Sequence, residues 1–546
     1  MGEPTVAPAR PGGVAHVRAW IGAQSGWRGA TLDFAAGAFG VLAQAPFHFV
    51  PALAVAFTIF IWRIDAIATE RRRRRAAFAR AFWFGFGYFL AGTYWISSAF
   101  LVDSDTWGPM WGIPATLAMG GGLSVLFWAP AFALAVPLWR PGWGRLALFA
   151  LTLSLAEYAR GHLFGGFPWN LVGYVWPAGG GVSQLAAYIG IYGLSTLTAL
   201  AAATPASLTD EGAGRAGRLA PILAAALGIG LAWGAGLQRL AQAASPVPGA
   251  SPIVRVADAG VSQRDKWQRL PDQEWRILER YAAVAGRPQD SRAQVVVWPE
   301  GAIPAVNFMP LENPAFLAAI GQALGDRALV IGFTRRALNA NGEMQYFNSA
   351  GVIDGVGGEP RIAQIYDKNR LVPFGEFIPL WGLVSSANIA PLQQIGAGFT
   401  PGAPPTRLVV PEAPSAVVLI CYEAIFTGFV PRGAERPGWL ISITNDAWFG
   451  RGTGPFQHYN MARYRAIEEG LPMARAASGG VSAIVDAYGR TVVKTGLEGG
   501  EVESQLPGEV APTLYSRLGN LLTLLVLFAV SLVYLASPRA GGARHV

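Results

Sequence analysis

The sequence contains one cysteine, Cys421, among 546 residues. A single thiol excludes any disulfide within the chain and any cysteine-rich zinc or iron–sulfur site. The five histidines form no pair spaced by four residues, so the sequence also lacks the simplest histidine arrangement for a metal site. We therefore expect no protein-held metal and no cofactor.

Charged residues are also scarce. They make up 14% of the chain, whereas 52% of the residues are hydrophobic, and an ordinary soluble protein has about 25% charged residues. The shortage is confined to residues 1–240, because the later part up to about residue 510 has the composition of a normal globular domain. A compact soluble enzyme is thereby excluded, and the chain is expected to have two parts with different surroundings.

The N-terminal part and the extreme C-terminus contain apolar runs long enough to cross a bilayer, which needs about 20 residues. We predict eight spans near residues 29–46, 48–64, 81–101, 113–138, 144–161, 182–204, 219–238 and 518–536. The domain boundaries expected from this pattern are a helical membrane part at 1–245, a soluble domain at 246–512 and a last span with a short tail at 513–546.

Arginines mark every second connection between these runs. Basic residues flank the first span, follow the second, fourth and sixth spans, and follow the last one: Arg18, Arg28, Arg71 to Arg75, Arg140, Arg145, Arg215, Arg218, Arg539 and Arg544. Basic loops stay in the cytoplasm, so both termini are expected there and the soluble domain on the opposite side. The net charge of +8 thus reflects membrane topology, and nucleic-acid binding is not expected.

The soluble domain alternates short β-rich runs with amphipathic helices. Buried strands are predicted at 295–297, 328–331, 417–420 and 440–443, a pattern typical of an α/β domain that presents functional residues at its strand ends. Glu300, Lys368 and Cys421 each follow such a run. Together they supply a base, a cation for a developing oxyanion and a nucleophile, whose thiolate the start of a helix would favour.

Three motifs around these residues resemble the nitrilase, or carbon–nitrogen hydrolase, superfamily. They are W-P-E-G at 298–301, Y-x-K-x-x-L-V-P-F-G-E at 366–376 and L-I-C-Y-E at 419–423. The apolar spans and the sequence F-P-W-N at 167–170 narrow the resemblance to its membrane-bound members, the apolipoprotein N-acyltransferase family. The resemblance implies a bundle of about eight transmembrane helices joined to an extracytoplasmic αββα sandwich.

The resemblance also implies the roles of individual residues. Glu300 would be the general base, Lys368 the oxyanion-stabilising cation and Cys421 the nucleophile. Supporting roles fall to Glu376, Tyr422 through its backbone N–H, Glu423, Trp267 and Asn348, although an asparagine before a serine is also common in turns. The chain departs from the family at Ser478, where asparagine is usual, and at Leu471, where arginine is frequent.

The activity that the family implies is transfer of an acyl chain from a phospholipid, through a cysteine thioester, to the α-amino group of the N-terminal diacylglyceryl-cysteine of bacterial apolipoproteins. A monomer in the bacterial inner membrane with a periplasmic catalytic domain is expected, and the apolar stretch 379–384 could reach the bilayer. Two alternatives remain: a membrane-tethered amidase that uses water as the acceptor, and a transporter. A transporter would place more polar or ionisable groups inside its spans, where Asp33 and Glu157 are the only carboxylates.

Overall fold

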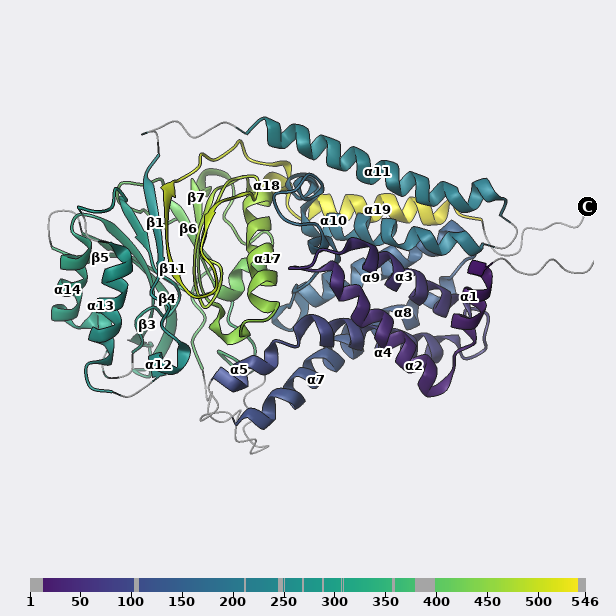
Figure 1. Cartoon of the computed structure of the whole chain (residues 1–546), viewed down its shortest axis with the longest axis horizontal. Coiled ribbons are helices and arrows are strands. Elements are labelled where there is room, and N and C mark those ends of the chain that lie inside the picture. The colour runs from purple at the N-terminus through teal and green to yellow at the C-terminus, as the bar shows by residue number, and fades with distance from the viewer. Residues whose placement is uncertain are drawn as a thin grey trace, which may run out of the picture.

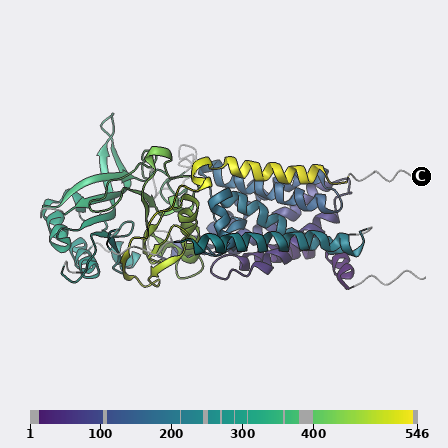
Figure 2. The ribbon, with the colours of Figure 1, turned by 90° about the horizontal axis from the view of Figure 1, so that it is seen from above.

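The computed structural model describes residues 13–102, 108–210, 213–243, 249, 251–267, 270–286, 289–305, 307, 309–355, 359–378 and 398–538, with the side chain of Trp267 excepted. Within these residues the chain has two parts side by side, a bundle of helices and a sandwich of two β-sheets (Figure 1). The last helix returns to the bundle, so that α11 and α19 both run along it in the two views (Figures 1 and 2).

The bundle contains helices from both ends of the chain. Its helices are α1 (Gly13–Ala23), α2 (Gly26–Gly40), α3 (Val50–Asp65), α4 (Arg73–Thr93), α5 (Ile96–Val102), α7 (Gly112–Leu123), α8 (Ala129–Ala135), α9 (Trp143–His162), α10 (Ala186–Ala203), α11 (Arg215–Ala241) and α19 (Leu521–Leu535). A single π-helical turn, η3 (Ser124–Trp128), joins α7 to α8.

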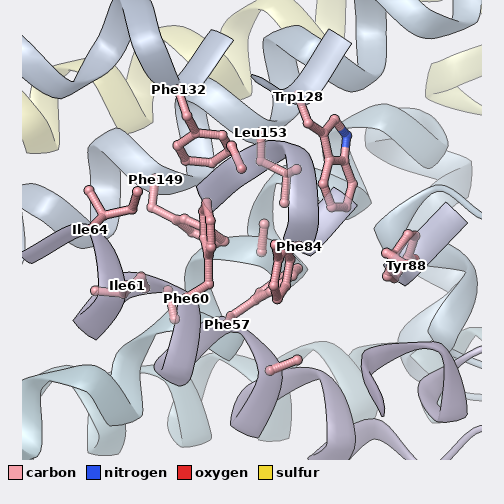
Figure 3. Packing of buried hydrophobic residues seen from close by; sticks show 14 of the residues in the cluster. Phe57, Phe60, Ile61, Ile64, Phe84, Tyr88, Trp128, Phe132, Phe149 and Leu153 are labelled. Atoms are coloured by element: carbon pink, nitrogen blue, oxygen red, sulfur yellow. The ribbon is translucent and has the colours of Figure 1, made fainter. Parts of the chain in front are cut away.

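Aromatic side chains fill the centre of the bundle (Figure 3). Phe60 of α3 stacks on Phe84 of α4 with ring centroids 4.5 Å apart, and it meets the edge of Phe132 of α8 at 4.9 Å. Glycines let α2 and α4 cross closely, because a Cβ at Gly37 would lie 1.9 Å from the carbonyl oxygen of Phe84. Small residues at helix crossings are how helices pack tightly in lipid.

Each of the eight apolar runs predicted from the sequence contains helix in the structure. By length and composition, however, only three stretches of the described residues could cross a membrane: Pro109–Leu138, Val182–Thr209 and Arg215–Ala241. The helices α2, α3 and α19 have only 15, 16 and 15 residues, whereas a crossing needs about 17 to 25. Eight spans therefore remain a prediction.

The two carboxylates expected inside the spans are each paired with an arginine. Asp33 accepts a hydrogen bond from Nε of Arg63 at 2.7 Å, and Glu157 accepts one from Nε of Arg160 at 2.9 Å. A buried charge needs such a partner because it has lost its water. The pairing makes both acids structural members of the bundle.

The other part of the chain consists of two β-sheets. The first has the strand order β11-β1-β2-β3-β4-β5, and the second has the order β10-β9-β8-β7-β6. Their bounds are β1 (Ile253–Asp258), β2 (Val295–Val297), β3 (Ala328–Leu338), β4 (Met344–Asp354), β5 (Arg361–Asp367), β6 (Ala416–Ile420), β7 (Trp439–Asn445), β8 (Met473–Ser478), β9 (Ala483–Val485), β10 (Thr491–Lys494) and β11 (Gly500–Gln505). All four predicted strands are present.

The two sheets pack face to face, with helices on both outer faces. Side chains such as Val256 and Val297 of the first sheet share one buried core with Val418 and Ile441 of the second. Helices α13 (Gln273–Ala285) and α14 (Pro314–Leu324) cover the first sheet, and α17 (Gly454–Glu469) covers the second. The expected αββα sandwich is confirmed. Three neighbouring strands run parallel in each sheet, β1, β2 and β3 in the first and β6, β7 and β8 in the second, which brings their carboxyl ends to one edge.

Helix α17 also joins the sandwich to the bundle. The side chain of Asn460 accepts a hydrogen bond from the backbone N–H of Ala178 at 3.0 Å, and Glu468 accepts one from Ile191 at 2.8 Å. Tyr464 and Tyr422 pack in the same buried cluster as Trp169. The edge of the sandwich that carries Cys421 therefore faces the bundle.

Candidate active site

Glu300, Lys368 and Glu376 meet where strands β2 and β5 end. The ammonium of Lys368 lies 3.3 Å from Oε1 of Glu300 and 2.9 Å from Oε1 of Glu376. Lys368 is 1% exposed, so this cation is shared between two carboxylates in a dry setting. The other oxygen of Glu300 accepts a 2.8 Å hydrogen bond from the backbone N–H of Asn445, at the end of β7 in the opposite sheet.

Asn348 lies at the centre of this cluster. It belongs to strand β4, so the alternative that it forms part of a turn is wrong. Its side-chain nitrogen donates to Oε1 of Glu300 and to Oε1 of Glu376, both at 2.7 Å. Lys368 lies beside it because the backbone N–H of Lys368 donates to the carbonyl oxygen of Asn348.

The charges in this cluster set its protonation states. Burial alone would raise the pKa of Glu300, but the Lys368 ammonium and the hydrogen bonds from Asn348 and Asn445 lower it below the ordinary value. Burial opposes the charge on Lys368, whereas Glu300 and Glu376 raise its pKa. The arrangement thus holds a carboxylate beside an ammonium, as a base and an oxyanion-stabilising cation require.

Cys421 follows β6 directly and is 9% exposed. Its φ of +49° places the backbone in the left-handed region, which is unusual for a residue with a side chain. The hydroxyl of Thr444 acts to lower the pKa of the thiol. The thiol, the Glu300 carboxylate and the Lys368 ammonium are close enough to influence one another's charge.

The predicted help from a helix N-terminus is wrong for Cys421. The residue begins a 3₁₀ helix of five residues, η11 (Cys421–Ile425), rather than an α-helix, and a single short turn provides little dipole. Burial, together with the charge of Glu300, raises the pKa of the Cys421 thiol. Nucleophilic attack by this thiol would therefore need a base to remove its proton.

Glu423 connects the loop after β5 to the loop after β6. One of its oxygens accepts hydrogen bonds from the hydroxyl of Tyr366 and the backbone N–H of Asn369, both at 2.7 Å. Its other oxygen accepts from the backbone N–H of Ile420 at 2.8 Å. Burial raises the pKa of Glu423 to about 7, although these hydrogen bonds act in the opposite direction. Glu423 thereby fixes Lys368 and Cys421 relative to each other.

Tyr422 connects the loop that carries Cys421 to the bundle. Its hydroxyl donates to the carbonyl oxygen of Gly166. The F-P-W-N loop at 167–170 follows Gly166 and is anchored by Arg160. The guanidinium of Arg160 donates to the carbonyl oxygen of Trp169 at 2.9 Å. The F-P-W-N sequence therefore packs against the loop that carries Cys421.

Two sequence-based expectations fall wholly or partly outside the described residues. Trp267 is the last residue of α12 (Gln263–Trp267), and only its backbone is described. The apolar stretch 379–384 lies outside the described residues altogether.

Lys266 is a site residue that the sequence reasoning did not assign. It is 3% exposed, and its ammonium donates to the hydroxyl of Ser478 at 3.3 Å. Burial lowers the pKa of Lys266 to about 8, while the charges of Asp258 and Glu300 oppose this shift. The feature of the sequence that could have pointed to Lys266 is the rarity of lysine in the chain. Ser478, one of the two departures from the family, thus contacts a cation near Glu300. The other departure, Leu471, packs in the apolar core under α17.

Comparison with known proteins identifies both parts of the chain. The family model of the apolipoprotein N-acyltransferase N-terminal domain matches residues 36–204, and that of the carbon–nitrogen hydrolases matches residues 255–504. An apolipoprotein N-acyltransferase of Rhodopseudomonas palustris is 38% identical over 95% of this chain and 96% of that relative. One from Bradyrhizobium diazoefficiens is 38% identical over 92% and 95%, and one from Caulobacter vibrioides is 36% identical over 94% and 96%. The chain therefore belongs to the apolipoprotein N-acyltransferase family.

Proposed function

We propose that this protein is an acyltransferase that moves an acyl chain from a phospholipid to the α-amino group of the N-terminal diacylglyceryl-cysteine of bacterial apolipoproteins. The relatives named above are apolipoprotein N-acyltransferases, and their similarity to this chain extends over nearly the whole length of both proteins. The observation that carries the mechanism is the buried cluster of Glu300, Lys368, Glu376 and Asn348 beside the only thiol of the chain.

In the first half-reaction Glu300 takes the proton of the Cys421 thiol, and the sulfur forms a bond to the carbonyl carbon of the phospholipid ester. The carbonyl oxygen becomes negative beside the Lys368 ammonium and the backbone N–H of Tyr422. When this intermediate collapses, the bond to the glycerol oxygen breaks and that oxygen takes the proton from Glu300. A lysophospholipid leaves, and Cys421 carries the acyl chain as a thioester.

In the second half-reaction the neutral α-amino group of the apolipoprotein attacks the thioester carbon. Glu300 accepts a proton from the nitrogen, and the same two donors stabilise the second oxyanion. Collapse breaks the carbon–sulfur bond, and the proton on Glu300 returns to the sulfur. The products are an N-acyl amide and a regenerated Cys421 thiol. Asn348 and Glu376 keep Glu300 and Lys368 in place, and Glu423 orients the two loops.

The same proposal covers location. We place the chain as a monomer in the bacterial inner membrane, with about eight spans, cytoplasmic termini and a periplasmic catalytic domain at residues 246–512. The alternating arginine-rich connections support this orientation. The buried Cys421 supports transfer over hydrolysis, since a thioester has to be shielded from water until the amine arrives.

The direct test is intact-mass analysis of the purified protein after incubation with phospholipid. The wild type should gain the mass of one acyl chain, and Cys421→Ala should gain none while remaining folded. A diacylglyceryl-cysteine peptide should then discharge the adduct within seconds to give an N-acyl peptide. An adduct of equal yield on Cys421→Ala would remove the nucleophile assignment. A wild-type thioester that hydrolyses rapidly and ignores the peptide would instead identify a tethered amidase with water as its acceptor.

A further inference from the structure

Arg370 is a cation that the mechanism above does not use. It lies two residues after Lys368 in the loop that follows β5, and its side chain is exposed. Lys368 shares its charge with two carboxylates, and Arg160 is paired with Glu157. Within the described residues, by contrast, the guanidinium of Arg370 has neither a hydrogen bond nor an ion pair; its one contact is with an aromatic ring. This positive charge is therefore available to a ligand.

The backbone of Arg370 is fixed relative to Cys421. The backbone N–H of Arg370 donates to Oε1 of Glu423 at 3.1 Å. The other carboxylate oxygen of Glu423 accepts from the backbone N–H of Ile420, the residue before Cys421, at 2.8 Å. Because one buried carboxylate holds both loops, Arg370 has a defined place beside the thiol.

An aromatic ring directs the side chain of Arg370. Its guanidinium carbon lies 5.2 Å from the ring centroid of Phe426, the residue that follows η11. Stacking on an aromatic face holds a guanidinium but leaves its N–H groups able to donate at the edges. The charge also extends to Tyr422. Burial raises the pKa of the Tyr422 hydroxyl, and the positive charges of Arg160, Arg370 and Lys368 oppose this shift.

The surroundings of Arg370 are apolar and include part of the bundle. The rings of Phe426 and Tyr422 meet edge to face with centroids 5.1 Å apart, and both pack in one buried cluster with Trp169 of the F-P-W-N sequence. Residues 379–397, which continue the loop after the motif, contain no aspartate or glutamate. A cation that lacks a carboxylate partner beside apolar groups attracts anions of opposite charge from outside the protein.

The acyl donor in the proposed reaction carries such an anion. A phospholipid has its phosphodiester on the same glycerol as the ester that reacts, so the phosphate is only a few bonds from the carbonyl carbon. Arginine can bind a phosphate through two parallel N–H···O hydrogen bonds, which gives a defined orientation as well as attraction. We propose that Arg370 binds the phosphate of the phospholipid donor while the ester carbonyl lies at Cys421. This site rests on the proposed function. The same chemistry would bind a free phosphate ion, and the test distinguishes the two.

The test compares two acyl donors that differ in the phosphate headgroup. Acylation of Cys421 by phosphatidylglycerol, or by a diacylglycerol with the same chains, is followed by intact-mass analysis in a phosphate-free detergent. The variants are Arg370→Met, which lacks the charge, Arg370→Lys, which keeps it, and Arg407→Met. Arg407 is the matched control, because it is an exposed arginine of the same domain.

We expect wild-type Cys421 to be acylated about tenfold faster by phosphatidylglycerol than by diacylglycerol, as one hydrogen bond between charged groups predicts. Arg370→Met should lose this preference through a slower reaction with phosphatidylglycerol and an unchanged rate with diacylglycerol. Arg370→Lys should keep part of the preference and Arg407→Met all of it. An Arg370→Met variant with the wild-type preference would overturn the proposal. Equal loss of rate with both donors would also overturn it, since a structural defect does not distinguish the donors.

A binding measurement decides the site if no acyl adduct forms. In a Cys421→Ala background, titration calorimetry measures the affinity for a short-chain phosphatidylglycerol, which Arg370→Met should weaken about tenfold. An unchanged affinity would overturn the site. Displacement of the lipid by an equal concentration of inorganic phosphate would identify a free-anion site and overturn the lipid assignment. Absence of an acyl adduct on wild-type Cys421 would refute acyl transfer, whereas the phosphate site is decided separately by binding.

Discussion

The side-chain nitrogen of Asn348 donates a 2.7 Å hydrogen bond to Oε1 of Glu300. The same nitrogen donates to Oε1 of Glu376 at the same distance, so both of its protons are used on carboxylates that also share the ammonium of Lys368. Two negative charges are thereby held close together by one cation and one neutral donor. Because Glu300 shares the Lys368 ammonium with Glu376, it stays ionised, as the base in the proposed mechanism must be.

Replacing Asn348 by aspartate should disturb that balance. The change removes both hydrogen bonds and adds a third carboxylate, which raises the pKa of Glu300 by repulsion. A hydrogen bond to a charged group contributes about 1.5–3 kcal/mol, so single-turnover acylation of Cys421 should fall by roughly 10- to 150-fold at neutral pH and recover partly at higher pH. The measurement is the acylation rate between pH 6 and 9.

Asn341→Asp is the matched control for this change, because Asn341 is exposed at the turn between β3 and β4. Its rate and pH profile should equal those of wild type. An Asn348→Asp enzyme with the wild-type profile would show that Asn348 does not tune Glu300.

Lys368→Ala should slow both half-reactions. Loss of one oxyanion donor typically costs about 2.7–4 kcal/mol, which is about 100- to 1,000-fold in rate. Acyl-enzyme formation and its discharge by a diacylglyceryl-cysteine peptide are measured separately by rapid mixing and mass analysis. Lys494→Ala removes an exposed lysine from the same domain and should leave both rates unchanged. If Lys368→Ala formed the acyl-enzyme at the wild-type rate, this lysine would not stabilise the oxyanion and would be only a structural ion-pair partner of Glu376.

Glu469 should make the stability of the protein depend on pH. Burial and the neighbouring Glu468 raise the pKa of Glu469 to about 8, whereas an unfolded glutamate has a pKa of about 4.3. Between these values the folded state keeps a proton that the unfolded state has released, so stability falls as pH rises through this window. Glu469→Gln removes the free-energy cost of keeping this buried group protonated in the folded state. The variant should therefore be more stable than wild type by a few kcal/mol at pH 8 but by little at pH 5.

Thermal unfolding of wild type and Glu469→Gln in detergent at the two pH values measures this effect. Glu435→Gln, which changes an exposed glutamate, controls for the loss of a carboxylate and should shift neither midpoint. An equal difference between Glu469→Gln and wild type at pH 5 and pH 8 would contradict the assignment.

The orientation in the membrane can be tested by cysteine labelling in a Cys421→Ala background. A membrane-impermeant maleimide added to intact spheroplasts should label Asn341→Cys, in the soluble domain, and spare Arg72→Cys, in the arginine-rich connection between α3 and α4. The reason is that basic connections stay in the cytoplasm. Both sites should react after lysis, and the reverse pattern in intact spheroplasts would invert the proposed topology.

Local patterns in the sequence predicted an α/β domain with functional residues at its strand ends, whereas the αββα sandwich was implied by the resemblance to the nitrilase superfamily. Glu300 and Cys421 each follow an apolar run that forms a strand, whereas Lys368 follows β5, whose residues are mostly exposed or half-buried. Parallel pairing places the carboxyl ends of β1, β2 and β3 at one edge of the first sheet and those of β6, β7 and β8 at one edge of the second. The strand before Lys368, β5, instead pairs antiparallel with β4. Helices were predicted equally well in the N-terminal part, since each apolar run contains one, but apolar length alone did not establish eight crossings.

Other features depended on contacts between residues far apart in the sequence. The role of Asn348 follows from the pairing of β4 with β5, which places it beside Lys368. The expected helix after Cys421 is a short 3₁₀ turn, because tertiary contacts rather than local propensity determine that loop. His458 of α17 lies 37 residues after Cys421 in the sequence, yet its Nε2 is 3.1 Å from the carbonyl oxygen of Cys421. Composition and strand periodicity determined which side chains were available for chemistry. The packing of the two sheets and α17 decided the distances between these side chains and their protonation states. The reason is that electrostatic interactions between buried groups depend on their positions in three dimensions.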